Sequence, residues 1–199
     1  MSAAEQVVVI GAGASGLSTA GALARRRVDA LVVDRGERIG DSWATRYERL
    51  HLHTIRRFSG LAHHGIPRRF PRYLSKDEYA AYLQEYAAAA GLRVALGETV
   101  TAVRSGWEVE TSRRTLRTSV VVVATGHYMQ PRMPQWEGVE AFRGRLLHSA
   151  EYRTGRDFFG QRALVVGLGN SGAEITADLV EQGAASVSVA VNASADRDA

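Results

Sequence analysis

The chain has 199 residues, of which 45% are hydrophobic, enough for one large domain or two small ones with a sizeable core. It contains no cysteine, which excludes disulfides, thiolate metal sites and dithiol redox chemistry within these residues and fits a reducing, cytoplasmic setting. It shows no signal-peptide pattern, and every apolar run is much shorter than the roughly 20 residues of a membrane helix. We therefore expect no membrane partner.

The net charge of +4 comes almost entirely from arginine, because Lys76 is the single lysine. Seven arginines between Arg46 and Arg72 are interleaved with aromatic residues, a composition also found in single-strand nucleic-acid grooves. The chain carries no nucleic-acid-binding motif, however, and cofactors with several phosphates also need local positive charge. We therefore expect a solvated or cofactor-facing basic surface and no nucleic-acid partner.

A short buried strand followed by a glycine-rich turn opens the chain. The apolar, β-branched run Val7–Ile10 predicts the strand, and Gly11, Gly13 and Gly16 follow at G-x-G-x-x-G spacing. The first glycine permits a sharp turn, the second leaves room for a pyrophosphate at the backbone, and the third lets the next helix lie close to the sheet.

The segment after these glycines completes a strand–helix–strand pattern. Apolar residues at helical spacing predict a helix over 14–27, and a second strand follows over 30–33. Asp34 stands at the end of that strand, 23 positions after Gly11, where a carboxylate can accept hydrogen bonds from ribose hydroxyls. Together these features predict a dinucleotide-binding turn.

The next forty residues form a loop that contains Trp43 and then an irregular excursion with little periodicity. His51 and His53 alternate with leucines, but no further ligand falls at a convincing spacing, so we expect no metal site. A helix over Ser75–Gly91 follows, with a capping box at Ser75 and Glu78 and a stripe of tyrosines that reads as core packing.

Short strands occupy the middle of the chain and return it to the parallel sheet. The expected strands are Leu92–Leu96, Val100–Val103, Trp107–Glu110, Thr115–Thr118 and the apolar Val120–Val123. The last of them ends at Thr125-Gly126, a turn that we expect at the carboxyl edge of the sheet, where ligands bind in such folds.

The opening pattern recurs at an offset of 156 residues. Strand Ala163–Val166 leads into Gly167, Gly169 and Gly172, and strand Ser186–Val191 closes the unit. Between them a helix carries an apolar face formed by Ile175, Leu179 and Val180. Two fingerprints predict two dinucleotides. The fold class is therefore α/β, with two Rossmann-like domains built on parallel sheets, a small antiparallel meander, and an incomplete second domain.

At this point the motifs resemble a known family. VVVIGAGASG, VVVVATGHYMQP, VVGLGNSGAE and the signature Phe142-x-Gly144-x-x-x-His148-x-x-x-Tyr152 are similar to those of the flavin-containing monooxygenases. The pattern WxxRYxxLxLHT, from Trp43 to Thr54, resembles the YUCCA-like branch. The resemblance covers nearly the whole chain.

The resemblance implies an FAD-binding domain over 1–155 and the start of an NADPH-binding domain over 156–199. It implies that NADPH reduces FAD, that reduced flavin captures O₂, and that a C4a-peroxyflavin passes one oxygen to a small nitrogen, sulfur or 2-oxo acid substrate. No catalytic side chain is then required, and a homodimer is possible. The implied cofactor-binding residues are Gly11, Gly13, Ala14, Ser15, Gly16, Asp34, Arg35, Trp43, His53, Thr125, Gly126, Gly167, Gly169, Asn170, Ser171 and Gly172.

Two signature residues allow further expectations. His148 reads as a structural hinge residue rather than a proton-transfer group. Tyr152 stands where Baeyer–Villiger relatives usually carry Trp, which favours N- or S-oxygenation or oxidative decarboxylation. No acid follows the last strand at Val191, which favours NADPH over NADH, although only modestly because acids flank the nearby Arg197.

Three alternatives stay open at the level of the sequence. A pyridine-nucleotide disulfide reductase shares both fingerprints but needs a cysteine pair, which this chain lacks. A flavin NADPH oxidase that releases peroxide would have the same motifs. A non-catalytic nucleotide-binding fragment of the family is the third, and we expect a truncated product because little follows the second fingerprint.

Overall fold

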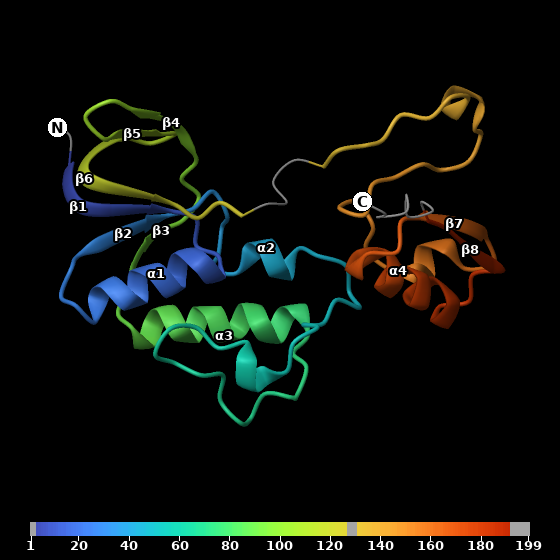
Figure 1. Cartoon of the computed structure of the whole chain (residues 1–199), viewed down its shortest axis with the longest axis horizontal. Coiled ribbons are helices and arrows are strands. Elements are labelled where there is room, and N and C mark those ends of the chain that lie inside the picture. Colours follow the sequence, from blue (N-terminus) through green and yellow to red (C-terminus); the bar gives the residue numbers. More distant parts are fainter. Residues whose placement is uncertain (1–2, 127–130, 192–199) are drawn as a thin grey trace, which may run out of the picture. The chain divides into compact units, whose positions relative to one another are not determined.

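The computed structural model describes residues 3–126 and 131–191 (Figure 1). The chain forms two compact units: unit 1 is Met1–Thr45 and His51–Met129, and unit 2 is Arg46–Leu50 and Gln130–Ala199. The boundary between these compact units falls near residue 130, and five residues of the early excursion belong to unit 2. The reason is that Tyr47, Tyr152 and Phe158 share one apolar cluster with the second-fingerprint helix.

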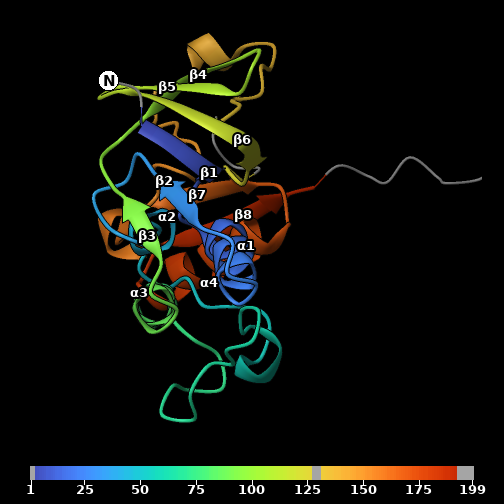
Figure 2. The same cartoon turned by 90° about the vertical axis from the view of Figure 1, so that its left-hand side faces the viewer.

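Unit 1 is built on one six-stranded sheet with the order β3-β2-β1-β6-β5-β4 (Figure 2). Its strands are β1 (Ala3–Ile10), β2 (Ala30–Val33), β3 (Arg93–Ala95), β4 (Val100–Arg104), β5 (Glu108–Thr111) and β6 (Thr115–Val123). Strand β1 runs parallel to both β2 and β6, β2 runs parallel to β3, and β4, β5 and β6 form an antiparallel meander. The expected α/β class is confirmed.

Opposite faces of β1 enter two different apolar clusters. Val7 and Val9 pack with helices α1 (Ala14–Ala24) and α3 (Lys76–Ala89), and Val8 and Ile10 pack with meander residues. The strand is therefore apolar at every position from Val7, because both faces are covered. All four of these side chains are less than a tenth exposed.

The expected strands at 115–118 and 120–123 are one continuous strand, β6, so that prediction is wrong in its division. Residues 115–117 pair antiparallel with β5, and residues 116–118 and 120–123 pair parallel with β1. Among the described residues, 120–123 pair only with β1, and Val123 is 69% exposed. This run is therefore less buried than its composition suggests.

The helices of unit 1 keep most of their predicted features. Ser75 and Glu78 form the capping box of α3, and Gly91 adopts φ +60° beyond its C-terminus, as predicted. Helix α1 ends at Ala24, three residues earlier than expected, and its buried residues are Gly16, Leu17, Ala20 and Gly21. The short elements α2 (Asp41–Ala44) and η1 (Arg56–Phe58) lie in the excursion.

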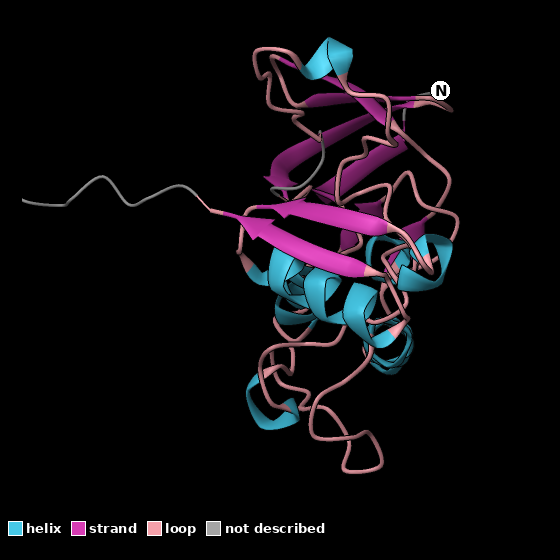
Figure 3. Ribbon diagram, turned by 90° about the vertical axis from the view of Figure 1, so that its right-hand side faces the viewer, coloured by secondary structure: helices cyan, strands magenta, loops and turns pink. Residues whose placement is uncertain are grey.

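Unit 2 contains a parallel pair of strands, β7 (Arg162–Val166) and β8 (Ser186–Ala190), joined by helix α4 (Asn170–Glu181) (Figure 3). The 3₁₀ turns η2 (Val139–Ala141) and η3 (Gly155–Phe158) precede them. Ile175 and Leu179 are buried as predicted, but Val180 is 60% exposed, so its place on the apolar face was wrong. Val180 directly follows Leu179, so the helix turns its side chain away from the buried stripe.

Candidate functional site: two dinucleotide-binding turns

The first fingerprint forms a tight turn between β1 and α1. Gly11 adopts φ +114°, a conformation that favours glycine. A Cβ on Gly16 would lie 1.8 Å from the carbonyl oxygen of Gly11, so the helix can approach the strand only without that side chain. A Cβ on Gly13 would meet nothing within 4 Å, so the space in front of this residue is open. The sharp turn at Gly11 and the close approach of the helix at Gly16 are as predicted, and the space at Gly13 is open.

Asp34 lies beside this turn and helps to hold it. Its Oδ2 accepts a 2.6 Å hydrogen bond from the Ala12 N–H, and its Oδ1 accepts a 2.7 Å bond from the Gly36 N–H. The carboxylate has further acceptor sites beyond these two bonds, so it can still accept from ribose hydroxyls. The bond to Ala12, which the sequence did not predict, fixes the acid at the glycine turn. Arg35 follows directly and is itself engaged in an interaction.

The Thr125-Gly126 turn joins the same edge of the sheet. The Ala124 N–H donates to the Ile10 carbonyl at 2.8 Å, and a Cβ on Gly11 would lie 2.4 Å from the Ala124 oxygen. A shallow hollow of about 350 Å³ opens here, lined by Ser15, Thr19 and residues 122–126. The structure thus brings the first fingerprint and the Thr125 turn together at the carboxyl ends of β1 and β6.

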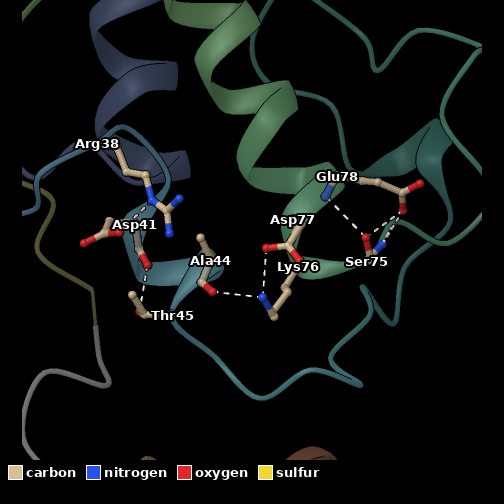
Figure 4. Close-up of polar contacts among 8 residues, drawn as sticks. All are labelled: Arg38, Asp41, Ala44, Thr45, Ser75, Lys76, Asp77 and Glu78. Atoms are coloured by element: carbon tan, nitrogen blue, oxygen red, sulfur yellow. Dashed lines mark hydrogen bonds and ion pairs between the residues drawn. The ribbon is translucent and has the colours of Figure 1, made fainter. Parts of the chain in front are cut away.

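Trp43 belongs to the short helix α2. Side-chain contacts hold this helix at both ends (Figure 4). Its ring packs edge-on against Tyr79 of α3, with ring centroids 4.8 Å apart. The Lys76 ammonium donates to the Ala44 carbonyl at 2.9 Å and pairs with Asp77 at 2.8 Å, which holds the C-terminal end of α2 (Figure 4). The other end is held by the Arg38–Asp41 ion pair at 3.0 Å.

His53 lies in the excursion and is exposed. The neighbouring His51 forms an antiparallel bridge with Ser75, and the Leu52 N–H donates to the Leu74 carbonyl at 2.7 Å. The structure places His53 beside the start of α3 rather than within the glycine turn. The residues that the structure describes contain no group of three His, Cys, Asp or Glu that could hold a metal ion.

The backbone geometry of the second fingerprint is similar to that of the first. Gly167 adopts φ +95°, and a Cβ on Gly172 would lie 2.1 Å from the Gly167 carbonyl oxygen. A Cβ on Gly169, like one on Gly13, would meet nothing within 4 Å. Both glycines are helix N-caps, with ψ −175° at Gly13 and −176° at Gly169. Asn170 and Ser171 form the first turn of α4 and are exposed.

The two fingerprints differ at the position that Asp34 occupies in the first. The Gly11 N–H donates to Val33 and the Gly167 N–H donates to Ala190, each at 2.8 Å, so Ala190 corresponds to Val33. Val191 therefore takes the place of Asp34, and it is 59% exposed. Arg197 and its flanking acids lie outside the described residues.

Helix α4 instead carries a row of acids that bind distant residues of unit 2. The Tyr47 hydroxyl donates to Glu174 at 2.9 Å, and the Tyr152 hydroxyl donates to the buried Asp178 at 2.6 Å. Burial and the neighbouring carboxylates raise the pKa of both tyrosines well above the ordinary value, so both remain protonated donors.

Two more contacts extend this row. The Gly155 N–H donates to Asp178 at 2.8 Å, and Arg49 pairs with Glu181 at 2.8 Å. We missed this arrangement from the sequence, although acids at positions 174, 178 and 181 follow helical spacing and give a visible signal.

The contacts that the structure records for His148 are all with residues close to it in sequence. Its Nδ1 accepts from the Ala150 N–H at 3.1 Å, and its backbone N–H donates to Glu151 at 2.9 Å. These contacts shape the turn that leads to Tyr152. They agree with a structural role for this signature histidine.

A family model described as pyridine nucleotide-disulphide oxidoreductase matches residues 8–199. Indole-3-pyruvate monooxygenase YUCCA1 of Oryza sativa subsp. japonica is 41% identical over 184 residues, which cover 89% of this chain and 45% of that protein. Probable indole-3-pyruvate monooxygenase YUCCA1 of Arabidopsis thaliana is 38% identical over 185 residues, with the same coverage of each chain. The chain therefore spans less than half the length of these relatives.

Solved structures of flavin-dependent proteins are also similar to this chain. The flavin-containing monooxygenase from Stenotrophomonas maltophilia matches with a TM-score of 0.87 and 30% identity, covering 96% of this chain and 58% of that one. OTEMO, solved in complex with FAD and NADP, matches with a TM-score of 0.74 and 28% identity, covering 95% of this chain and 39% of that one.

The fold and its two glycine turns define an α/β protein of the Rossmann-like class, as in the structural neighbours. The chain belongs to the pyridine nucleotide-disulphide oxidoreductase family. Its resemblance to the flavin monooxygenases is confirmed by the YUCCA relatives and by the structural neighbours. No residue of the printed sequence is a cysteine, so disulfide exchange through a cysteine pair is not available to this chain. In the described part of the chain, no helix combines the length and apolar character needed to cross a membrane.

Proposed function

We propose that the protein binds FAD at the first fingerprint and NADPH at the second, and acts as a flavin-dependent monooxygenase. The observation that carries this proposal is the duplicated turn: two strand-to-helix junctions with the same glycine geometry and the same open space at the second glycine. A single such turn is a common feature, but two in one chain match an enzyme that uses two dinucleotides.

The residues of unit 1 fit FAD. Gly13 leaves space for the pyrophosphate in front of the N-terminus of α1, whose backbone N–H groups favour an anion. Asp34 is held beside this turn and can accept from the ribose hydroxyls. The hollow at Val122–Gly126 adds open space along the same edge of the sheet.

The residues of unit 2 fit the nicotinamide dinucleotide. Gly169, Asn170 and Ser171 would take its pyrophosphate at the N-terminus of α4. Val191, in the position of Asp34, brings no carboxylate to repel a 2′-phosphate, which favours NADPH over NADH.

The cofactors supply the chemistry when bound: NADPH delivers a hydride to the flavin, and the reduced flavin activates O₂ so that one oxygen atom reaches the substrate. The chain's own residues bind and orient the two dinucleotides. We infer a small substrate, and the relatives named for indole-3-pyruvate favour a 2-oxo acid over an amine or a sulfide.

Titration of the purified chain with FAD, followed by flavin fluorescence, tests the first half of this proposal. We expect one FAD per chain. Gly13→Val should weaken FAD binding at least tenfold with an unchanged circular dichroism spectrum, because the new side chain occupies open space instead of the core. Gly169→Val is the matched control, because it makes the same change in the other copy and should leave FAD binding unaltered. Failure of the unsubstituted chain to take up FAD would overturn the proposal.

Consumption of NADPH distinguishes the oxygenase from the peroxide-forming oxidase. In a preparation that turns over, the oxygenase consumes NADPH in step with a 2-oxo acid substrate, whereas the oxidase forms peroxide without one. The 199 residues span 45% of the YUCCA relatives, and we expect them to bind FAD without sustained NADPH oxidation. Sustained oxidation by this chain would show that the rest of those relatives is dispensable.

A further inference from the structure

Residues 56–72 of unit 1 form a closed loop, which we call the basic loop. The Arg56 N–H donates to the Arg72 carbonyl at 2.7 Å and so joins the two ends of the loop. The Arg56 guanidinium donates to the Arg68 carbonyl at 2.9 Å and also to the Phe70 carbonyl. An ordered loop of this length in a compact domain is usually functional.

The basic loop is anchored to the two long helices of unit 1. The Ala62 N–H donates to the Ser18 hydroxyl of α1 at 3.1 Å. The Tyr82 hydroxyl of α3 accepts from the Leu61 N–H at 2.7 Å and donates to the His64 carbonyl at 2.6 Å. Figure 1 and Figure 2 show the loop on the side of α3 that faces away from the six-stranded sheet. Its outer surface is therefore separate from the glycine turn at the edge of that sheet.

The basic loop carries positive charge that the described residues do not neutralise. The sequence has no acid between Glu48 and Asp77. Arg69 pairs with Glu85 of α3. In the described part of the chain, no ion pair is recorded for three further arginines of the loop, all of them exposed: Arg57, Arg68 and Arg72. Such a local excess of one charge attracts a partner of the opposite charge.

Exposed aromatic rings lie directly beside these charges. Phe58 is 74% exposed, and the guanidinium carbon of Arg57 lies 5.8 Å from its ring centroid. Tyr73, the residue after the loop, is 46% exposed, and Arg72 lies over its ring at 5.6 Å. At a phospholipid surface an aromatic ring enters the boundary between headgroups and acyl chains, while a neighbouring cation meets the phosphates. Pairs of an exposed ring and a cation therefore suit an anionic lipid surface.

A single-stranded nucleic acid fits the same rings less well. Its bases stack on open aromatic faces, whereas a guanidinium already lies over the rings of Phe58 and Tyr73. Phe70 is still less accessible, because Arg69 lies over it at 4.9 Å and the ring also packs against the apolar core. The charge and the rings together thus favour lipid over nucleic acid.

We propose that the basic loop is a membrane-contact surface, which binds the headgroups of anionic phospholipids through its arginines and inserts the Phe58 ring between them. The expectation of no membrane partner came from the lack of a spanning segment, which a surface contact does not need. This inference goes beyond the proposed function and does not depend on the binding of either cofactor.

Co-sedimentation of the purified chain with lipid vesicles tests the inference. We expect binding to vesicles of about 30% phosphatidylserine in phosphatidylcholine, loss of that binding in high salt, and no binding to phosphatidylcholine alone. The double substitution Arg57→Gln/Arg72→Gln should weaken binding by about tenfold or more, because both arginines meet the lipid. Phe58→Ala should weaken it by about fivefold, because the ring no longer enters the interface.

Each of these variants has a matched control. Arg26→Gln/Arg27→Gln removes the same charge from exposed positions just after α1, and Trp107→Ala removes another exposed ring, at the turn between β4 and β5. Both controls should bind the vesicles within about twofold of the unsubstituted chain, because they lie outside the basic loop. All variants are compared after their circular dichroism spectra are shown to match that of the unsubstituted chain.

Failure of the unsubstituted chain to sediment with the phosphatidylserine vesicles would overturn the inference. Equal losses within either matched pair would also overturn it, because they would trace binding to net charge or to exposed rings in general. Tighter binding of a single-stranded oligonucleotide than of the vesicles would overturn it in favour of a nucleic-acid surface. FAD titration of the same variants should be unchanged, so failure here leaves the proposed function intact.

Discussion

The two glycine turns have the same backbone geometry in different surroundings. Strand β1, which leads into the first, is covered on both faces, and Val8 and Val9 are fully buried. In β7, which leads into the second, Leu164 is 64% exposed and Val166 is 57% exposed. The turn is therefore specified locally, by a glycine with positive φ and a third glycine against its carbonyl, and forms in a two-stranded sheet as well as in a six-stranded one.

The two helices that follow are stabilised by different means. Helix α1 packs through Leu17 and Ala20 into an apolar cluster, and its Gly21 lies directly against the Tyr86 hydroxyl. Helix α4 buries Ile175 and Leu179 but also depends on its carboxylates, which bind tyrosine hydroxyls and a backbone N–H. We therefore expect substitutions of the tightly packed glycines to lower the stability of unit 1 most. Substitutions of the carboxylates of α4 should lower the stability of unit 2.

Gly16→Ala should have the largest effect. Its Cβ would lie 1.8 Å from the Gly11 carbonyl oxygen, inside a fully packed core, so the backbone itself must shift. We expect a loss of more than about 3 kcal/mol of stability in unit 1, together with the loss of FAD binding. Urea unfolding measures the stability. Gly65→Ala is the control, because a Cβ there meets nothing within 4 Å, and equal stability of the two variants would contradict the account.

Asp178→Ala should cost about 2–3 kcal/mol, because it leaves the Tyr152 hydroxyl and the Gly155 N–H as buried donors without their acceptor. The effect should be confined to unit 2. Because a chain of two units need not unfold in one step, hydrogen exchange resolved along the chain is the suitable measurement.

The exposed Asp157, two residues after Gly155, gives the control for this substitution. Asp157→Ala should change exchange in neither unit. Loss of protection spread evenly over both units by Asp178→Ala would show that the acid row is not specific to the second fingerprint.

The buried Glu98 gives unit 1 a dependence on acid pH. Hydrogen bonds from Arg114 and Thr111 hold the pKa of Glu98 below its ordinary value of 4.5, although burial opposes them. A lowered pKa in the folded state contributes stability above the ordinary pKa, and that contribution is lost as the pH falls through the folded-state value.

Glu98→Gln should therefore cost about 1.5 kcal/mol at neutral pH and less at low pH. Urea unfolding of both proteins at pH 7 and well below pH 4.5 measures the difference, and a cost that stays constant with pH would contradict the assignment. In unit 2 the Arg49–Glu181 pair is exposed, so Glu181→Gln should show a smaller dependence.

Val191→Asp should have a smaller and more selective effect. It places in the second copy the acid that the first copy has at Asp34. We expect NADP⁺ to bind about tenfold more weakly, because the carboxylate repels the 2′-phosphate, and NAD⁺ to bind more tightly. Val191→Asn is the uncharged control and should leave the ratio of the two affinities near its original value, which we expect to favour NADP⁺ only modestly. If Val191→Asp left the ratio of NADP⁺ to NAD⁺ affinity unchanged, Val191 would not lie at the ribose site.

Local features were predicted well from the sequence. The apolar run before Gly11, the glycine spacing and the capping box at Ser75 each determine a few consecutive residues, and the structure has them as expected. The division of β6 was wrong because Thr118 and Ser119 look like a break, while pairing with β1 carries the strand through them. The contact of Tyr47 with α4 was missed because it joins residues 127 positions apart. Such contacts depend on tertiary packing and leave no local pattern.

The most direct test of the central claim, two turns for two different dinucleotides, is a pair of titrations on the same three proteins. FAD and NADP⁺ are titrated separately and then together into the unsubstituted chain, Gly13→Val and Gly169→Val. We predict one equivalent of each ligand without mutual displacement, loss of FAD alone in Gly13→Val, and loss of NADP⁺ alone in Gly169→Val. Displacement of one ligand by the other, or loss of both ligands in either variant, would contradict the account.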